Sequence, residues 1–174
     1  EILRKLIEKS KLKNNKRALA RSYFCYADML RLQANMLSAI DVQKKALKIY
    51  QVLNDNKFIY YCYGRLCFYY SMIGQYSNAL DYIDKSISIL VKLDDKIGMG
   101  GHFNRSADIY ARLGDYRNAL KYFNLSLDII LEHDEVNIDR KKGIEFEIYQ
   151  VYSYMGDFKS AIKYFLEYYE FIKT

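Results

Sequence analysis

The chain has 174 residues, of which 51% are hydrophobic and 28% charged, and it contains neither proline nor tryptophan. This balance excludes an intrinsically disordered chain, and the length suits one domain with a sizeable core. Because proline is excluded from helix interiors, its absence favours an all-helical fold. The apolar runs are too short to span a membrane, and no secretory leader opens the sequence, so we expect a cytoplasmic protein with no membrane partner. Since the chain begins at Glu1 rather than Met, we expect it to be part of something longer.

The net charge of +6 is concentrated at one end of the chain. Residues 1–21 carry eight basic and two acidic side chains, so residues 22–174 sum to zero. A nucleic-acid-binding protein more often carries a basic stripe along its body. We therefore expect no nucleic-acid partner. RNA binding through residues 1–21 is a less favoured alternative, which a steep salt dependence of affinity would reveal.

The cysteines Cys25, Cys62 and Cys67 are too few and too irregularly spaced for a disulfide framework. Neither of the two histidines has a cysteine or carboxylate nearby at the spacing of a metal site. We interpret the cysteines as reduced packing residues and expect no metal and no cofactor.

Taken in chain order, the sequence divides into a short leading segment and four similar repeats. A glycine-centred motif recurs at 74–80, 114–120 and 156–162, with a degenerate copy at 34–40. Short polar junctions keep the same register at residues 14–15, 54–56, 94–95 and 134–135. A period of about 40 residues is typical of repeat architectures. We therefore predict the end of an earlier repeat at 1–13, followed by repeats at 14–54, 55–94, 95–134 and 135–174.

Each repeat is predicted to be a pair of helices, most clearly in the third. One face of its first helix is marked by residues at i, i+3, i+4 and i+7, namely Phe103, Ser106, Ala107 and Tyr110. Gly114 suits the left-handed residue that ends a helix, and Asp115 suits the N-cap of the next. The inner face of the second helix is predicted to carry Ala119, Phe123, Ser126 and Leu127. Small alanines let two helix axes approach while aromatic side chains fill the surrounding space.

This pattern resembles the tetratricopeptide repeat, in which an aromatic, a small residue and a tyrosine of the first helix precede Ala-x-x-x-Phe in the second. The third repeat matches through Phe103, Ala107, Tyr110, Ala119 and Phe123, and the other three keep part of the set. The copies are about six residues longer than the usual 34 and lack its proline, as in the longer repeats of cell-polarity adaptors and bacterial peptide-pheromone receptors. The resemblance implies an all-α, right-handed solenoid of antiparallel helix pairs whose concave face binds peptides.

The fourth repeat departs from the pattern at Tyr149 and Tyr168, where small residues are usual. Its last helix is rich in aromatic side chains, whereas a terminal repeat normally presents a polar outer face. We therefore expect residues 163–174 to be covered, either by a homodimer partner or by a continuation of the solenoid.

Candidate ligand-binding residues follow from taking the same six positions on the first helix of every repeat, the face that lines the groove in this family. These 24 positions hold five of the nine arginines and none of the 18 lysines. Arginine pairs bidentately with carboxylates and stacks on rings. The candidates are Arg21, Phe24, Asp28, Arg31, Tyr61, Arg65, Phe68, Asn104, Arg105, Asp108, Arg112, Phe146, Gln150 and Tyr154.

Two interpretations of these arginines stay open. Five arginines outnumber Asp28, Asp108 and Glu147 by two charges, which favours a ligand that carries carboxylates beside an aromatic anchor. Alternatively, the arginines form an internal ion-pair ladder, with Arg65 on Asp28 or Asp108 and Arg105 on Asp108.

No nucleophile, base or phosphate-binding loop is recognisable, so we expect no enzyme. The sequence favours a non-catalytic protein- or peptide-binding scaffold. The alternative is the peptide-sensing module of a larger regulator whose output domain lies outside this sequence.

Overall fold

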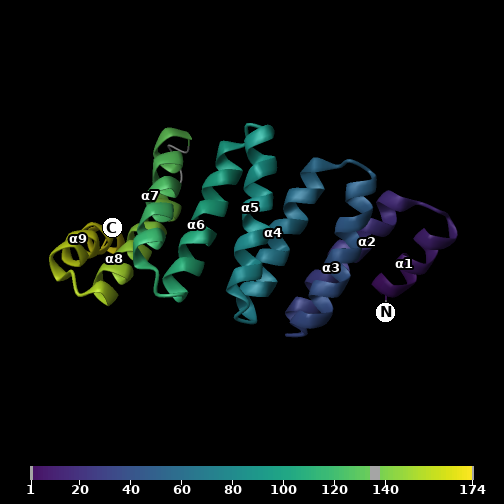
Figure 1. The fold of residues 1–174 in the computed structure, drawn as a ribbon, viewed down its shortest axis with the longest axis horizontal. Coiled ribbons are helices and arrows are strands. Elements are labelled where there is room, and N and C mark those ends of the chain that lie inside the picture. The colour runs from purple at the N-terminus through teal and green to yellow at the C-terminus, as the bar shows by residue number, and fades with distance from the viewer. Residues whose placement is uncertain (1, 134–137, 174) are drawn as a thin grey trace. The chain divides into compact units, whose positions relative to one another are not determined.

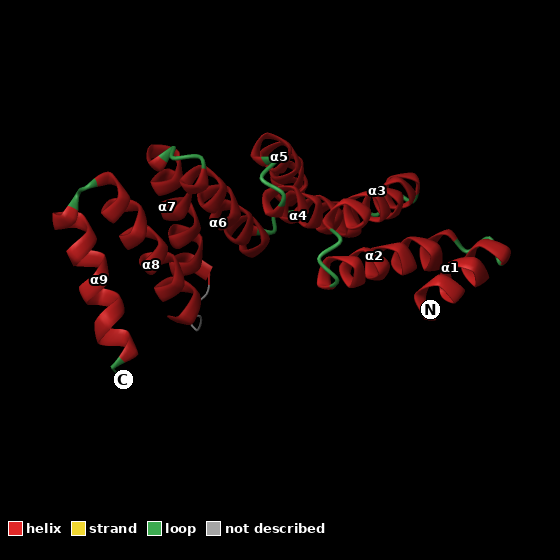
Figure 2. Ribbon diagram, turned by 90° about the horizontal axis from the view of Figure 1, so that it is seen from below, coloured by secondary structure: helices red, strands yellow, loops and turns green. Residues whose placement is uncertain are grey.

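The computed structural model describes residues 2–133 and 138–173 and confirms the all-helical prediction. Within these ranges the chain is 87% helical and contains no strand (Figure 2). The helices, drawn in chain order in Figure 1, are α1 (Ile2–Leu12), α2 (Lys16–Leu32), α3 (Met36–Val52), α4 (Asn56–Met72), α5 (Tyr76–Lys92), α6 (Lys96–Arg112), α7 (Tyr116–His133), α8 (Ile138–Met155) and α9 (Phe158–Ile172). None of the described helices is both long and apolar enough to cross a membrane.

The junctions between helices show why the sequence breaks where it does. Gly114 has φ +75°, a left-handed conformation that glycine adopts without a Cβ clash. The next residue, Asp115, then caps α7, because its Oδ1 accepts a hydrogen bond of 3.1 Å from the Asn118 amide. Both predictions for this turn are confirmed. The junction predicted at residues 134–135 lies outside the described residues.

The same turn is built with less suitable residues elsewhere. Asn14, Asn54 and Asp94, spaced 40 residues apart, also have positive φ, and the residue after each of them caps the following helix. Asparagine and aspartate tolerate this region better than most residues do. The degenerate motif copy uses Ala34 at φ +57°, so the turn is kept even where the sequence offers a β-carbon.

The helices form two compact units, which we call the N-terminal unit (residues 1–89) and the C-terminal unit (residues 90–174). In the N-terminal unit α1 packs on α2, α2 on α3 and α3 on α4. In the C-terminal unit α6 packs on α7, α7 on α8 and α8 on α9. Figure 2 shows α8 and α9 side by side and antiparallel, joined by a short turn.

Small residues lie at the helix crossings of both units, as predicted. Ala39 in α3 and Ala119 in α7, at equivalent positions, are both 0% exposed. Buried serines add a polar contact between paired helices: Ser86 Oγ donates to the Tyr60 carbonyl at 3.0 Å, and Ser126 Oγ donates to the Gly100 carbonyl at 2.8 Å. A β-carbon on Gly100 would meet Ile129 at 3.0 Å, so the glycine permits this close approach.

The last helix pair packs differently from the others. Glu145 occupies the position at which the earlier repeats carry Tyr23, Tyr63 and Phe103, yet it is only 3% exposed. Its carboxylate lies 2.7 Å from Lys142 Nζ and 3.5 Å from Lys141 Nζ. Tyr149 and Tyr168, where the fourth repeat departs from the repeat pattern, pack against other aromatic rings. The ring centroids of Phe146 and Tyr168 lie 4.8 Å apart, and those of Tyr149 and Phe165 lie 5.3 Å apart.

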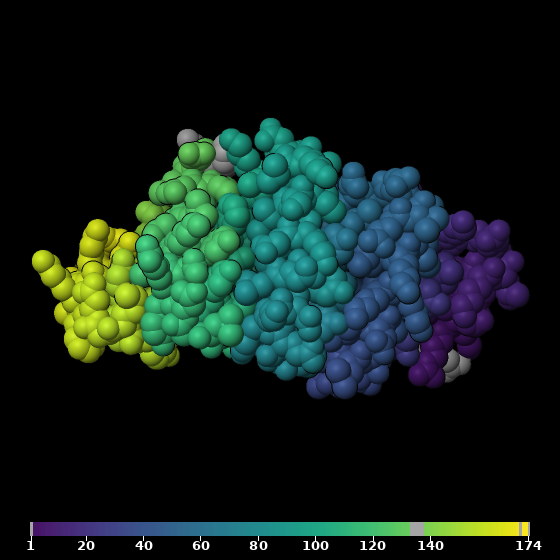
Figure 3. Space-filling model, in the orientation of Figure 1, coloured from purple at the N-terminus to yellow at the C-terminus, as the bar shows by residue number. Residues whose placement is uncertain are grey.

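The outer side of α9 is apolar and exposed. Phe165 is 40% exposed, whereas its counterpart Phe123, which α8 covers, is 1% exposed. Ile162 and Leu166 beside it are more than half exposed. In Figure 3 this helix forms the yellow surface of the C-terminal unit.

The cysteine prediction is right for two residues and wrong for one. Cys62 and Cys67 are buried packing residues with free thiols. Cys25 is also a free thiol but is exposed, because α2 turns this position toward solvent.

Candidate functional site

In the N-terminal unit, the candidate residues of α2 and α4 gather around one carboxylate. Arg31 Nε lies 2.9 Å and Arg65 Nη1 lies 3.0 Å from the same oxygen, Asp28 Oδ1. The contact between Arg65 and Asp28 confirms the first pairing that the ladder interpretation named. Two guanidinium groups thus share a single negative charge. We call Asp28, Arg31, Arg65, Phe24 and Phe68 the Asp28 cluster.

Aromatic rings hold the guanidinium groups of the Asp28 cluster in place. The Arg65 guanidinium carbon lies 4.0 Å from the centroid of the Phe24 ring, and that of Arg31 lies 5.9 Å from the Phe68 ring. Cation–π contacts of this kind favour the observed positions of the guanidinium groups. Both arginine side chains remain about one-third exposed, and Phe68 is 37% exposed. The cluster is therefore ordered and still reachable from solvent.

Two further candidates lie at the margin of this cluster. Tyr61 is 43% exposed, and its ring packs edge-on against Phe58 at 6.2 Å. Arg21 is exposed at the start of the same face of α2. Counting Arg21, the face carries three arginines against one aspartate.

In the C-terminal unit, four candidates gather around a pocket of about 390 Å³ between α6 and α8. We call it the Glu147 pocket. Asp108 and Arg112 come from α6, and Gln150 and Tyr154 come from α8. The remaining lining residues are Ala111, Tyr116, Glu147 and Val151.

The charges of the Glu147 pocket are unevenly compensated. Arg112 Nε lies 3.0 Å from Asp108 Oδ2, so Asp108 has a cationic partner within its own helix. No hydrogen bond or ion pair engages the Glu147 carboxylate within the described ranges. Partial desolvation and the nearby negative charge of Asp108 raise the pKa of Glu147, and Arg112 opposes this only in part. The pocket thus holds two carboxylates and one guanidinium group.

An aromatic wall closes one side of the Glu147 pocket. The rings of Tyr116 and Tyr154 stack at 6.2 Å with an interplanar angle of 11°. Tyr154 is 71% exposed, so its outer face is open. Tyr116 comes from α7, the second helix of its repeat, so a comparison of first-helix positions could not find it.

Glu147 also borders a second pocket of about 260 Å³, which we call the Asn104 pocket. Its other lining residues are Asn104, Arg140, Gly143 and Ile144. Asn104 Oδ1 is covered from solvent and has no hydrogen-bond partner among the residues described. An acceptor in this state favours any ligand that brings a donor to it.

Two candidates lie away from these pockets. Phe146 packs on Tyr168 and Tyr149, in the aromatic contacts between α8 and α9. Arg105 is exposed on α6. Burial of the His102 ring lowers the pKa of His102 to about 4, and the positive charge of Arg105 adds to this shift. No group of three or more His, Cys, Asp or Glu side chains suited to a metal ion occurs among the described residues.

Comparison with known proteins agrees with this helix pattern. The family model of the tetratricopeptide repeat matches residues 103–133, which correspond to one helix pair. No curated protein matches the chain in sequence.

Several solved structures share the fold at low sequence identity. The crystal structure of BtubC (BKLC) from P. vanneervenii has a TM-score of 0.81 and 17% identity, over 90% of this chain and 64% of that one. A putative kinesin light chain of Podosopora anserina with nearly identical TPR-like repeats has a TM-score of 0.78 and 13% identity, over 98% and 83%. A Rap protein complexed with Competence and Sporulation Factor has a TM-score of 0.73 and 14% identity, over 94% and 51%.

The chain therefore spans about two-thirds of the BtubC chain and half of the Rap chain. The family model thus identifies one tetratricopeptide repeat within the chain, and the solved structures show that the chain shares the helical fold of proteins with TPR-like repeats.

Proposed function

We propose that this chain is a non-catalytic, cytoplasmic scaffold that binds protein or peptide segments on the first-helix side of its repeats. The Asp28 cluster of the N-terminal unit binds the acidic or mixed acidic-aromatic part of such a segment. Arg21, Tyr61 and the cluster residues supply the contacts there. No cofactor takes part in this function.

The observation that carries the proposal is the sharing of Asp28 by two arginines. One carboxylate cannot neutralise two guanidinium groups, so a positive charge remains beside the exposed ring of Phe68. A ligand carboxylate can pair with a guanidinium group that is already held by an aromatic ring, and this saves part of the ordering cost of binding. Phe68 and Tyr61 offer apolar area for an aromatic anchor.

Peptide pools with fixed aspartate and phenylalanine, compared with pools carrying asparagine in place of aspartate, test this proposal. We expect the acidic pool to bind more tightly, and Arg65→Lys to weaken it several-fold, because lysine keeps the charge but loses the planar fork. Arg117→Lys, on an exposed position of α7, is the matched control and should bind like wild type.

Two results would contradict the proposal. One is equal binding of the aspartate and asparagine pools. The other is a double variant, Arg31→Ala with Arg65→Ala, that binds normally while melting at a lower temperature. The arginines would then be an internal ladder only.

The alternative function is the peptide-sensing module of a larger regulator. It is favoured by the similarity in fold to a Rap protein solved with Competence and Sporulation Factor, of which this chain spans 51%. An output activity in the full-length protein that responds to a bound peptide would distinguish this function from passive scaffolding.

We also propose a second partner surface on the apolar side of α9. This side is exposed, whereas the equivalent side of α7 is covered by α8. A second copy of the chain, or a further helix of the solenoid, covers this side. Sedimentation of the wild type and of a variant with lysines on this side of α9 tests it.

A further inference from the structure

We infer that the Glu147 pocket receives a basic side chain, preferably arginine, from the peptide ligand. The inference rests on the proposed function, because it assigns the chemistry of one subsite within it. It differs from the acidic preference assigned to the Asp28 cluster, so the two units recognise opposite charges.

The charge of the Glu147 pocket points to a cationic occupant. Asp108 and Glu147 contribute two negative charges, and Arg112 contributes one positive charge that is already bound to Asp108 at 3.0 Å. Arg112 acts on Glu147 only through its charge, and no ion pair joins Glu147 to a described side chain. A ligand cation placed beside Glu147 would supply the partner that the chain itself does not provide.

The unpartnered polar atoms are acceptors rather than donors. The Glu147 carboxylate borders both pockets, and Asn104 Oδ1, in the second one, is covered and without a partner in the described ranges. A ligand therefore has to bring hydrogen-bond donors. A guanidinium group carries five N–H donors in a planar fork, and the peptide backbone next to it adds another.

The shape of the pocket favours arginine over a small amine. A volume of about 390 Å³ exceeds what an ammonium group needs, and the open face of Tyr154 offers a surface on which a planar cation can stack. Two carboxylates, one of them already paired with Arg112, are a poor site for bare Ca²⁺ or Mg²⁺, since these cations take six or more oxygen ligands.

Because the chain contains no tryptophan, a tryptophan introduced into the Glu147 pocket reports on binding at this pocket alone. Tyr154→Trp keeps an aromatic wall and places a single fluorophore in the Glu147 pocket. The probes are three decapeptide pools that are identical except for one central residue: arginine, citrulline or glutamate. Citrulline has the shape of arginine without its charge. We expect the arginine pool to change the fluorescence at concentrations at least tenfold lower than the citrulline pool, and the glutamate pool to be weakest.

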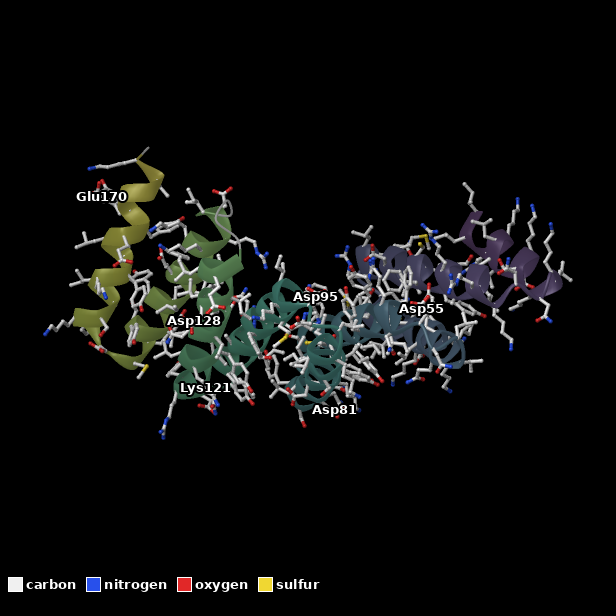
Figure 4. The ribbon with its side chains drawn as sticks, turned by 90° about the horizontal axis from the view of Figure 1, so that it is seen from above. Asp55, Asp81, Asp95, Lys121, Asp128 and Glu170 are labelled. Atoms are coloured by element: carbon white, nitrogen blue, oxygen red, sulfur yellow. The ribbon has the colours of Figure 1, made fainter. Side chains whose placement is uncertain are left out.

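Glu147→Gln in the same background should reduce the arginine preference to about twofold or less. Glu170→Gln is the matched control, because this side chain is exposed on α9 and points away from α8 in Figure 4. Circular dichroism of each variant checks that the fold is retained.

The possible outcomes separate this inference from the proposed function. If peptides bind but arginine and citrulline pools are equivalent, or Glu147→Gln leaves the preference intact, the pocket inference is wrong and the scaffold function stands. If the glutamate pool binds the Tyr154→Trp variant best, the cationic preference assigned to the Glu147 pocket is wrong. If no pool binds the wild-type chain by any readout, both proposals are overturned.

Discussion

The two units carry equivalent positions on their first helices but fill them with different charges. In the N-terminal unit three arginines face one aspartate, and aromatic rings hold two of the guanidinium groups in place. In the C-terminal unit Arg105 and Arg112 are balanced by Asp108 and Glu147, and both acids line one pocket. The surplus of two positive charges counted over all 24 positions therefore belongs to one unit. A repeat fold fixes where a side chain is presented, and each repeat chooses its charge independently.

The largest expected effect is overpacking of one unit at a helix crossing. Ala119→Leu adds three carbon atoms at a position that is 0% exposed in the core of the C-terminal unit, and should cost roughly 1–3 kcal/mol of unfolding free energy. Hydrogen exchange should accelerate in α6–α8 and stay unchanged in α2–α4.

Arg117→Leu, an exposed position two residues earlier, is the control for the added leucine. If Ala119→Leu melts like wild type, the role given to this alanine is wrong. If α2–α4 exchange equally fast, the units do not respond separately.

The second effect is a pH dependence confined to the C-terminal unit. Burial, with help from Arg105, lowers the pKa of His102 from 6.5 to about 4, against the opposing influence of Asp95 and of the Gly98 carbonyl 3.0 Å from Nδ1. The fold therefore holds the neutral imidazole. The associated stability is fully present above pH 6.5 and is lost as the pH falls through 4, by an amount on the order of 3 kcal/mol.

Denaturant unfolding of wild type and His102→Asn at pH 7 and pH 4.5 measures this contribution. The stability difference between the two proteins should shift in favour of the variant at the lower pH. A difference that is constant with pH would show that His102 titrates normally in the folded chain.

The third effect concerns Glu145, the buried acid at a position where the earlier repeats carry an aromatic residue. Glu145→Tyr combined with Lys142→Met restores the aromatic side chain of the other repeats and removes both charges of the pair, and should stabilise the C-terminal unit by about 1 kcal/mol, since replacing a buried ion pair by packed apolar groups is often favourable. Glu145→Ala alone, which leaves a cavity and an unpaired Lys142, should destabilise it. Thermal unfolding of both variants checks the opposite signs, and a loss of stability in the double variant would show that the buried ion pair is the better core.

The smallest effect on stability is expected on α9. Ile162→Lys with Leu166→Lys changes two side chains that are more than half exposed, so the unfolding free energy should move by no more than about 0.5 kcal/mol. Self-association at high concentration should nevertheless disappear. Sedimentation that shows wild type as a monomer at all concentrations would rule out the homodimer and leave a further helix as the covering partner.

Much of the fold could be predicted because it follows from short-range physics. Gly114 and Asp115 mark a turn and a cap by their own conformational and hydrogen-bonding properties, and the alanines mark helix crossings by size. The burial of Glu145 could not be predicted, because a glutamate that follows Lys141 and Lys142 has the appearance of an exposed helix position. Its burial depends on how the next helix, α9, packs on α8, which the spacing of residues along α8 does not determine.

The candidate sites were predictable only in part for the same reason. Comparing first-helix positions found Asp28, Arg65 and Asp108, and it indicated the contact between Arg65 and Asp28. It could not show that Arg31 and Arg65 share one oxygen atom, nor that Tyr116 of a second helix would form a wall with Tyr154. Such pairings depend on the packing of neighbouring helices, which the spacing of residues along one helix does not determine.

One contact in the N-terminal unit bears on how this part of the chain unfolds. Asp55 Oδ1 caps α4 by accepting from the Phe58 amide, while Asp55 Oδ2 accepts from Arg17 Nη2 of α2 at 3.3 Å. The same carboxylate therefore starts one helix and holds the beginning of another, 38 residues earlier in the sequence. Fraying of either helix end weakens the other, which makes the carboxylate a nearest-neighbour coupling between consecutive repeats. Since Arg17 is largely exposed, added salt screens its side of the contact, so we expect the coupling between these two repeats to weaken as ionic strength rises.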